Sequence, residues 1–181
     1  LINIFSIFYF MKNQVKISSI LTKDLRYRDI TSICKIKMEQ YKFSLKDQKK
    51  WFNKNIKKNY IHNLVCKHNK IIGYNCLRLN RSSKSIKPIL FDTIVLKKKF
   101  RGKGYAKFLM LKSNNIIMEK KAIGILFCKL RMVKFYQKFN WKIFKLPKNL
   151  GIRNNLICMV FTNLDKKKIK LESIKRFMRN K

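Results

Sequence analysis

A buried strand that leads into a basic glycine loop and then a helix constrains this chain more than any other feature. Residues 91–110 read FDTIVLKKKFRGKGYAKFLM, with Gly102 and Gly104 in the loop. Glycines permit left-handed backbone angles and let amide groups approach a ligand closely. The helix that follows offers unpaired N–H groups and the positive end of its dipole. The segment therefore predicts an anion cradle suited to a pyrophosphate. Five basic side chains surround it: Lys97, Lys98, Lys99, Arg101 and Lys103.

The spacing of the two glycines excludes the best-known phosphate motifs. A dinucleotide fingerprint needs GxGxxG, and a P-loop needs GxxxxGK followed by Ser or Thr. A glycine pair by itself also fits a tight strand-to-helix turn that binds nothing. The surrounding elements have to decide between these interpretations.

Hydrophobic periodicity predicts strands and helices in mixed order, with no internal repeat. Alternation and short apolar runs indicate strands over residues 14–21, 60–66, 70–79, 89–96, 122–128, 141–144 and 156–161. Apolar spacings of three and four indicate helices over residues 24–41, 105–119 and 132–139. Another helix carries Trp51, Phe52 and Ile56 on one face, after a capping box formed by Ser44 and Asp47. This order indicates a mixed α/β class.

Two motifs in this order carry a family resemblance. Arg101-x-x-Gly104-x-Ala106 resembles the acetyl-CoA signature, R/Q-x-x-G-x-G/A, of the GNAT superfamily of acyl-CoA-dependent N-acyltransferases. FYQKFNW begins 29 residues after Ala106 and resembles the family's FYEKLGF/W segment. Asn140 replaces the family's Gly there, and Asn also tolerates left-handed backbone angles. The resemblance spans residues 14–163 and implies a central, mostly antiparallel sheet, flanked by helices and splayed at the cofactor site.

The resemblance also implies where acetyl-CoA binds as cosubstrate. Backbone groups of Ile94, Val95 and Leu96 would pair with the pantetheine arm as an added strand. The pyrophosphate would lie on the amides of the cradle, which are those of Arg101, Gly102, Lys103, Gly104, Tyr105 and Ala106. The charged side chains of Arg101 and Lys103 would lie near the phosphates. Lys129 stands where many members have a CoA-contacting Asn, so that contact is not carried over.

Acetyl transfer to an amine needs a proton acceptor for the amine and benefits from a proton donor for the departing thiolate. Tyr136 matches the tyrosine that donates this proton in many members, with aromatic packing as its alternative role. Asp92, on the central strand, is our first candidate for the proton acceptor, and a hydrogen-bonded structural role is the alternative. His62 is the second candidate. Cys128 ends a strand near the expected thioester, but no His is placed to activate it, so we interpret it as packing.

The net charge allows two interpretations. The chain has 45 Lys and Arg against 8 Asp and Glu, a net charge of +37. This charge suits a phosphate-binding or membrane-binding surface. Coding bias also explains it, because Lys, Asn and Ile are all abundant and basic residues occur along the whole chain. A basic nucleic-acid- or ribosome-associated protein on a degenerate acyltransferase scaffold is therefore the alternative function. An intact cradle and Tyr136 favour the enzyme.

The chain divides into an N-acetyltransferase domain, residues 11–164, and two short ends. Residues 1–10 are an apolar extension that is too short to cross ~30 Å of hydrocarbon. We expect either an upstream non-Met start or an over-extended reading frame with Met11 as the true beginning. Residues 165–181 form a basic amphipathic tail. Five cysteines without a CxxC pair predict reduced thiols, a cytoplasmic protein and no metal site.

The acceptor is the least constrained part of the prediction. A small-molecule amine, such as an amino sugar, is our first choice, and the positive charge favours an anionic one. Residues 51–62 and 80–87 are expected to line its pocket. We expect no transmembrane segment, and a homodimer is compatible with the sequence.

Overall fold

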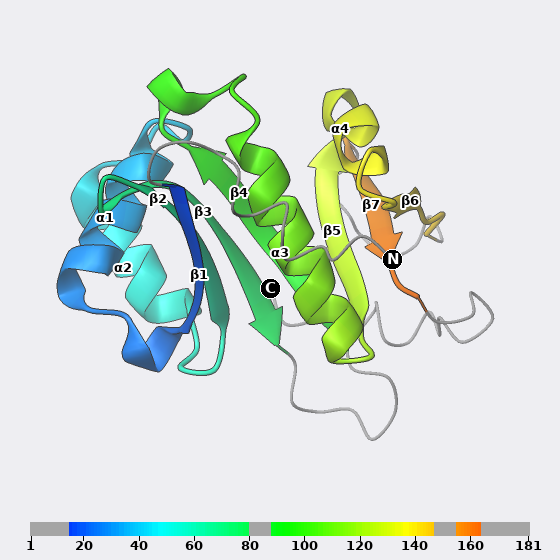
Figure 1. Ribbon diagram of the computed structural model, residues 1–181, viewed down its shortest axis with the longest axis horizontal. Helices are drawn as coiled ribbons and strands as arrows, with labels where there is room; N and C mark the ends of the chain where they lie inside the picture. Colours follow the sequence, from blue (N-terminus) through cyan, green and yellow to red (C-terminus); the bar gives the residue numbers. More distant parts are fainter. Residues whose placement is uncertain (1–14, 80–87, 147–154, 164–181) are drawn as a thin grey trace.

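The computed structural model describes residues 15–79, 88–146 and 155–163 (Figure 1). Its strands form one seven-stranded sheet in the order β1-β2-β3-β4-β5-β7-β6. The strands are β1 Val15–Leu21, β2 Ile61–Lys67, β3 Lys70–Leu79, β4 Pro88–Leu96, β5 Ile123–Lys129, β6 Lys142–Ile143 and β7 Leu156–Phe161. Every neighbouring pair is antiparallel except β4 and β5, which run parallel. The mixed class and the mostly antiparallel sheet are confirmed.

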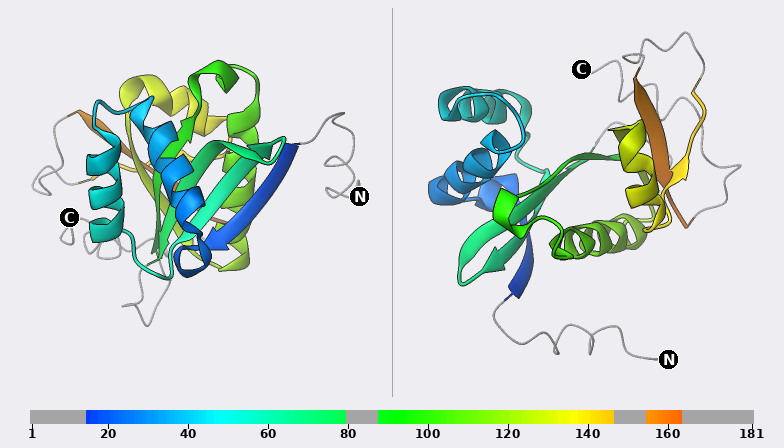
Figure 2. Two further views of the ribbon diagram at one scale, coloured as in Figure 1. Left: turned by 90° about the vertical axis from the view of Figure 1, so that its left-hand side faces the viewer. Right: turned by 90° about the horizontal axis from the view of Figure 1, so that it is seen from above.

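Helices cover both faces of this sheet. They are α1 Tyr27–Met38, α2 Leu45–Asn55, α3 Tyr105–Glu119 and α4 Val133–Gln137, with short 3-10 turns at Thr22–Asp24, Lys98–Phe100 and Leu130–Met132. Figure 2 shows α1 and α2 on one side of the sheet and α3 on the other. Each face has its own apolar core: α1 and α2 pack on β2, β3 and β4, whereas α3 and α4 share a core with β4, β5 and β7.

Some predicted boundaries were too wide. The helix predicted over 24–41 is shorter at both ends, because Leu25 and Arg26 are extended and Met38 is the last helical residue. Leu25 has helical spacing in the sequence, but it reaches the α1–α2 core from an extended segment. The predicted helix over 132–139 contracts to α4 after a 3-10 turn. Ser44 is the N-cap of α2, and its hydroxyl accepts a hydrogen bond from the Asp47 amide at 3.1 Å, which is one of the two bonds of the predicted capping box.

A β-bulge in β4 is the feature of the fold that most affects the site. In the β3–β4 register, Cys76 pairs with Thr93 and Leu77 pairs with Phe91, so Asp92 has no partner on β3. On its other side, β4 pairs with β5 only from Pro88 to Leu90. Beyond Leu90, β4 and β5 diverge in Figure 1, while β5 continues to pair with β7. The sheet is splayed, as predicted, and the splay begins beside the bulge.

The two predicted end segments and the predicted loop 80–87 lie outside the described residues. Within the described ranges, no helix has the length and apolar character needed to cross a membrane.

Candidate active site

The unpaired edge of β4 lies where the sequence predicts the pantetheine arm to bind. Ile94, Val95 and Leu96 pair with β3 on one side only, and in the described residues no strand pairs with them on the β5 side. An extended ligand can therefore add to this edge through main-chain hydrogen bonds. One carbonyl group at the end of β4, that of Leu96, already accepts a hydrogen bond from the Arg101 Nε at 3.1 Å.

The glycine loop has the backbone expected of an anion cradle. Gly102 and Gly104 both have left-handed backbones, with φ of 74° and 80°. A Cβ atom added at either position would meet no other atom within 4 Å, so this side of the loop is open. Gly104 is the N-cap of α3, and no side chain caps the helix. The first amides of α3 are therefore available to an anion.

The side chain of Arg101 braces this loop. Besides its bond to Leu96, its guanidinium donates to the Glu39 carbonyl at 3.5 Å, and the Lys98 amide donates to the Glu39 carboxylate. Both contacts tie the loop to the end of α1. The sequence analysis placed the Arg101 charge near the phosphates, whereas these bonds direct it toward the end of α1. The ring of Tyr105 is buried against Phe100, so only the amide of this residue is left for the predicted cradle.

Tyr136 on α4 lies beside the splay. Its ring contacts Phe91 of β4 edge to face, with 6.1 Å between ring centroids, and also packs near Phe135 and Trp141. Burial raises the pKa of its hydroxyl, with smaller contributions from Cys128 and Tyr41. The hydroxyl is protonated at neutral pH, as that of an ordinary tyrosine is, and its raised pKa makes it a weaker acid than usual.

The bulge turns two consecutive side chains of β4 toward α1 and α2. Successive residues of a regular strand point to opposite faces, but Asp92 and Thr93 both line one cavity on this side. The side chain of Asp92 is partly buried, with 19% of its surface exposed. Its Oδ2 is ion-paired with the Arg78 Nη2 at 2.8 Å. The carboxylate therefore faces the cavity while Arg78 holds it in place.

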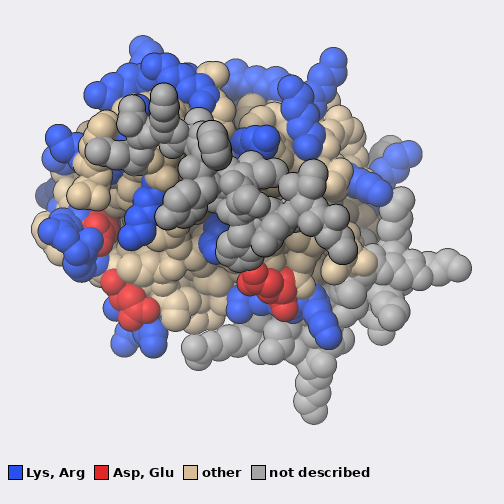
Figure 3. Space-filling model, viewed as in Figure 1, with Lys and Arg blue, Asp and Glu red and all other residues tan. Residues whose placement is uncertain are grey.

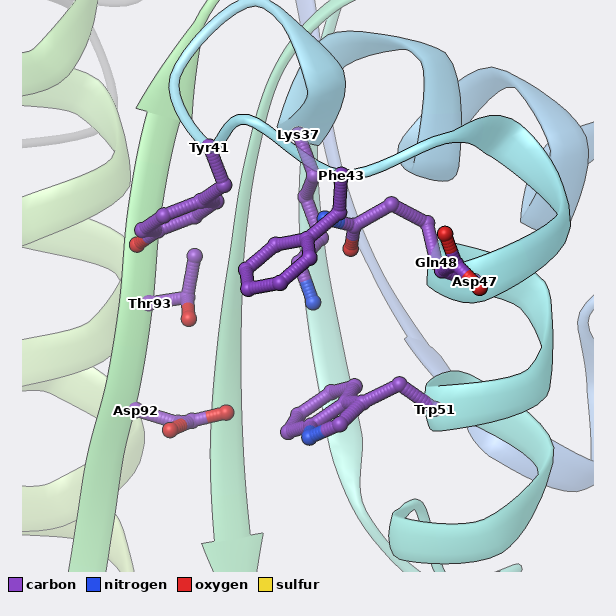
Figure 4. Close-up of a pocket in the computed structure, with 8 residues that line it drawn as sticks. All are labelled: Lys37, Tyr41, Phe43, Asp47, Gln48, Trp51, Asp92 and Thr93. Carbon is purple, nitrogen blue, oxygen red and sulfur yellow. The ribbon is translucent and has the colours of Figure 1, made fainter.

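The cavity has a volume of about 400 Å³ (Figure 4). Its walls come from α1, α2, the loop between them and β4, and are formed by Lys37, Tyr41, Phe43, Asp47, Gln48, Trp51, Asp92 and Thr93. Of the predicted lining segment 51–62, only Trp51 takes part, and the predicted loop 80–87 lies outside the described residues. Tyr41 lies beside Thr93 in Figure 4, so the loop after α1 meets β4 at this end of the cavity.

Lys37 was not among the predicted site residues, although its position in the sequence indicates an unusual environment. Lys37 follows Ile33 by four residues and Cys34 by three, so it lies on the apolar face of α1. A charged residue at such a position is unusual and points to a special environment. In a chain with a net charge of +37, one more lysine was not conspicuous.

The structure gives His62 a structural role. It is fully buried, and its Nε2 and Nδ1 are hydrogen-bonded to Thr22 Oγ1 at 2.7 Å and to the Tyr74 hydroxyl at 3.2 Å. Burial, with a smaller contribution from the charge of Lys37, lowers its pKa to about 4. Cys128 is also buried, donates to the Met159 sulfur at 3.8 Å, and has a pKa raised by burial. A buried thiol of this kind is unreactive.

Comparisons with known proteins place this geometry in a family. The profile described as "Acetyltransferase (GNAT) family" matches residues 27–141, which include both predicted motifs and most of the cavity. The chain belongs to the GNAT acetyltransferase family. It is thus an acetyl-CoA-dependent N-acetyltransferase, as the resemblance implied.

Solved structures share the GNAT fold at low sequence identity. The ribosomal-protein-S18-alanine N-acetyltransferase of Escherichia coli matches at a TM-score of 0.63 and 14% identity, over 82% of this chain and 94% of its own. The PaiA N-acetyltransferase of Thermoplasma acidophilum, in complex with coenzyme A, matches at 0.58 and 14%, over 82% and 99%. An aminoglycoside 6'-N-acetyltransferase complexed with coenzyme A matches at 0.61 and 12%, over 81% and 96%. No curated protein matches the sequence.

The basic character of this GNAT protein is not confined to its cradle. In Figure 3, Lys and Arg side chains surround most of the visible face, and Asp and Glu are few. Among the described residues, no group of three or more His, Cys, Asp and Glu side chains is placed to bind a metal ion. On the face shown, the basic residues are spread widely rather than gathered in one patch.

Proposed function

We propose that this GNAT protein transfers the acetyl group of acetyl-CoA to the primary amine of a small molecule, by direct attack in a ternary complex. One observation carries the proposal: the bulge at Asp92 lies beside both the unpaired edge of β4 and the cavity. A cosubstrate bound along the edge and an amine bound in the cavity would meet at this bulge. Holding two reactants together in this way supplies much of the rate of a bimolecular reaction.

The residues present suit acetyl-CoA. Ile94, Val95 and Leu96 offer the free edge for the pantetheine arm, and the open face of Gly102 and Gly104 offers room for a pyrophosphate. Lys103 is exposed on the same loop and supplies positive charge. Bound there, acetyl-CoA would supply a thioester whose carbonyl carbon an amine can attack.

The side chains around the bulge would then move the protons. Asp92 accepts the proton of the attacking amine, directly or through a water molecule, as the new N–C bond forms. A backbone N–H of the free β4 edge donates to the carbonyl oxygen as it gains negative charge. Tyr136 donates its proton to the sulfur as the C–S bond breaks. Its burial against Phe91 and Trp141 supports this role, because the ring is held in one place.

The size of the cavity supports a small acceptor. A volume of about 400 Å³ lies within the range of small-molecule pockets, roughly 300–1,000 Å³. The structural neighbours do not indicate one acceptor class for this chain, since one is named for the alanine of a ribosomal protein and another for an aminoglycoside. The walls combine aromatic rings with a few charged groups, which suits a compact amine.

Two measurements test the proposal. Acetyl-CoA should raise the melting temperature of the protein, whereas a short RNA at ~0.2 M salt should not, because electrostatic RNA binding weakens steeply with salt. A panel of primary amines should then give free CoA with at least one acceptor. Stabilisation by RNA but not by acetyl-CoA would favour the nucleic-acid function instead.

A further inference from the structure

Lys37 is a buried cation that lines the acceptor cavity. The residue is 5% exposed, yet it belongs to the cavity wall. Figure 4 shows its side chain running down from α1 with the ammonium pointing into the space above Trp51. The Nζ atom lies 3.9 Å from the centroid of the Trp51 ring, in cation–π geometry. This position favours the charged form of the amine.

No carboxylate among the described residues neutralises this ammonium. The two ion pairs in the described ranges are Arg26–Asp29 and Arg78–Asp92. Asp92 is therefore already paired. The other carboxylate of the cavity, Asp47, accepts a hydrogen bond from the Ser44 hydroxyl at 2.6 Å at the exposed start of α2. The Lys37 ammonium itself donates no hydrogen bond to any described residue.

Burying an unpaired ammonium is costly, and the cation–π contact offsets only part of that cost. Burial lowers the pKa of Lys37, while the charge of Asp92 raises it. An anionic oxygen group bound in the cavity would supply the missing partner and would form charge-assisted hydrogen bonds with the ammonium. The aromatic walls at Tyr41, Phe43 and Trp51 would contact the remainder of the molecule.

Resting on the proposed function, we infer that the acceptor is a small primary amine that also carries a carboxylate or phosphate group, and that Lys37 binds this group. The amine end then lies at Asp92 and Thr93 on β4, and the anionic end lies on α1 above Trp51. This assignment orients the acceptor, because its two ends bind opposite walls of the cavity.

The test compares matched acceptors that differ in the anionic group. Phenylalanine with phenylalaninamide forms the carboxylate arm, and glucosamine 6-phosphate with glucosamine forms the phosphate arm. For the wild-type protein, kcat/KM should be about 10- to 100-fold higher for the anionic member of at least one pair, the range expected for a hydrogen bond to a charged group. The arm that shows the preference identifies the anion. The amine of phenylalaninamide is less basic than that of phenylalanine, so more of it is in the neutral, nucleophilic form. Intrinsic reactivity therefore favours the amide and works against the expected preference for the carboxylate.

Three variants locate the effect. Lys37→Met keeps the length of the side chain and removes its charge, so the preference should fall to about onefold. Lys37→Arg keeps the charge and should retain part of the preference. Lys49→Met is the matched control: Lys49 also lies over an aromatic ring, that of Tyr27, but it is only partly buried and does not line the cavity. Its preference should equal that of the wild type.

Stability separates a binding role from a structural one. Replacing an unpaired buried charge by an apolar side chain of similar volume is neutral or stabilising. Lys37→Met should therefore melt at the wild-type temperature or above it. A lower melting temperature for this variant would show that the charge serves the fold and would overturn the inference.

The kinetic outcomes are equally decisive. Each of three results would overturn the inference. The wild type shows no preference, or the preference persists in Lys37→Met, or Lys37→Met loses activity equally on both members of a pair. If acetyl-CoA binds and only neutral amines are acetylated, the anionic acceptor is wrong and the proposed function stands. If acetyl-CoA does not bind, the proposed function itself fails.

Discussion

The ring of Phe91 on β4 meets the ring of Tyr136 on α4 edge to face, with centroids 6.1 Å apart and planes at 81°. The contact bridges the two parts of the sheet where β4 and β5 diverge. This contact is made by the two rings and does not involve the Tyr136 hydroxyl. The hydroxyl and the ring can therefore be tested separately.

Tyr136→Phe should lower kcat by about 10²- to 10⁴-fold, the usual worth of general acid catalysis. The loss should appear in kcat more than in KM, because the proton is needed only as charge develops on sulfur. Steady-state kinetics on one confirmed amine measure both constants. Tyr74→Phe is the control, since it removes another buried hydroxyl, in the α1–α2 core, and should affect stability but not kcat. A kcat for Tyr136→Phe within a few-fold of the wild type would leave Tyr136 with a packing role only.

Gly104→Val should abolish the rise in melting temperature that acetyl-CoA causes. The valine side chain would occupy the open face of the loop where we place the pyrophosphate, and a positive φ is unfavourable for a branched residue. Asn69→Val separates these two effects, because Asn69 has a φ of 57° in the β2–β3 turn and is not part of the glycine loop. Both variants should melt lower than the wild type, and only Asn69→Val should still respond to acetyl-CoA. A wild-type response from Gly104→Val would show that the cradle lies elsewhere.

Asn140→Val should destabilise the fold by about 1–2 kcal/mol, the cost of a left-handed backbone for an ordinary residue. Asn140 has a φ of 64° in the turn that leads from α4 to the buried Trp141. By the usual scaling, the melting temperature should fall by roughly 2–8 °C. Asn140→Gly should stay close to the wild type, because glycine adopts this conformation without steric cost. Similar melting temperatures for the two variants would argue that the turn changes its conformation.

His62 should make the stability depend on pH below neutrality. In the unfolded chain it gains a proton below its usual pKa of about 6.5, whereas the folded protein keeps it neutral down to a pKa of about 4. The unfolded state therefore binds more protons between these values, and stability falls as the pH drops from about 6.5 to 4. A shift of this size is worth roughly 3 kcal/mol.

Urea unfolding of the wild type and of His62→Gln at several pH values from 4 to 7.5 would measure this effect. The exposed His68 and all carboxylates are common to both proteins, so they cancel in the difference. The gap between the two free energies of unfolding should narrow or change sign as the pH falls. A constant gap would mean that His62 titrates normally in the folded protein.

Local sequence alone was enough to predict the left-handed glycine loop and most elements of this protein. A left-handed backbone depends on the residue itself and its nearest neighbours, so the glycines of the loop and Asn140 were visible in the sequence. The same holds for α3, whose bounds were predicted without error, and for the N-cap of α2 at Ser44. Together with the spacing of the two motifs, these local features were sufficient to identify the family.

Only the tertiary structure decided where the proposed acceptor cavity lies and which side chains face it. The bulge at Asp92 depends on the register between β3 and β4, and the free edge of β4 depends on where its pairing with β5 ends. Lys37, Trp51 and Asp92 meet through contacts between segments far apart in the chain. Hydrophobic periodicity shows which face of an element is buried, but not which partner covers it. For that reason the position of Lys37 on the apolar face of α1 could be interpreted only once the structure placed it over the ring of Trp51 and in the wall of the cavity.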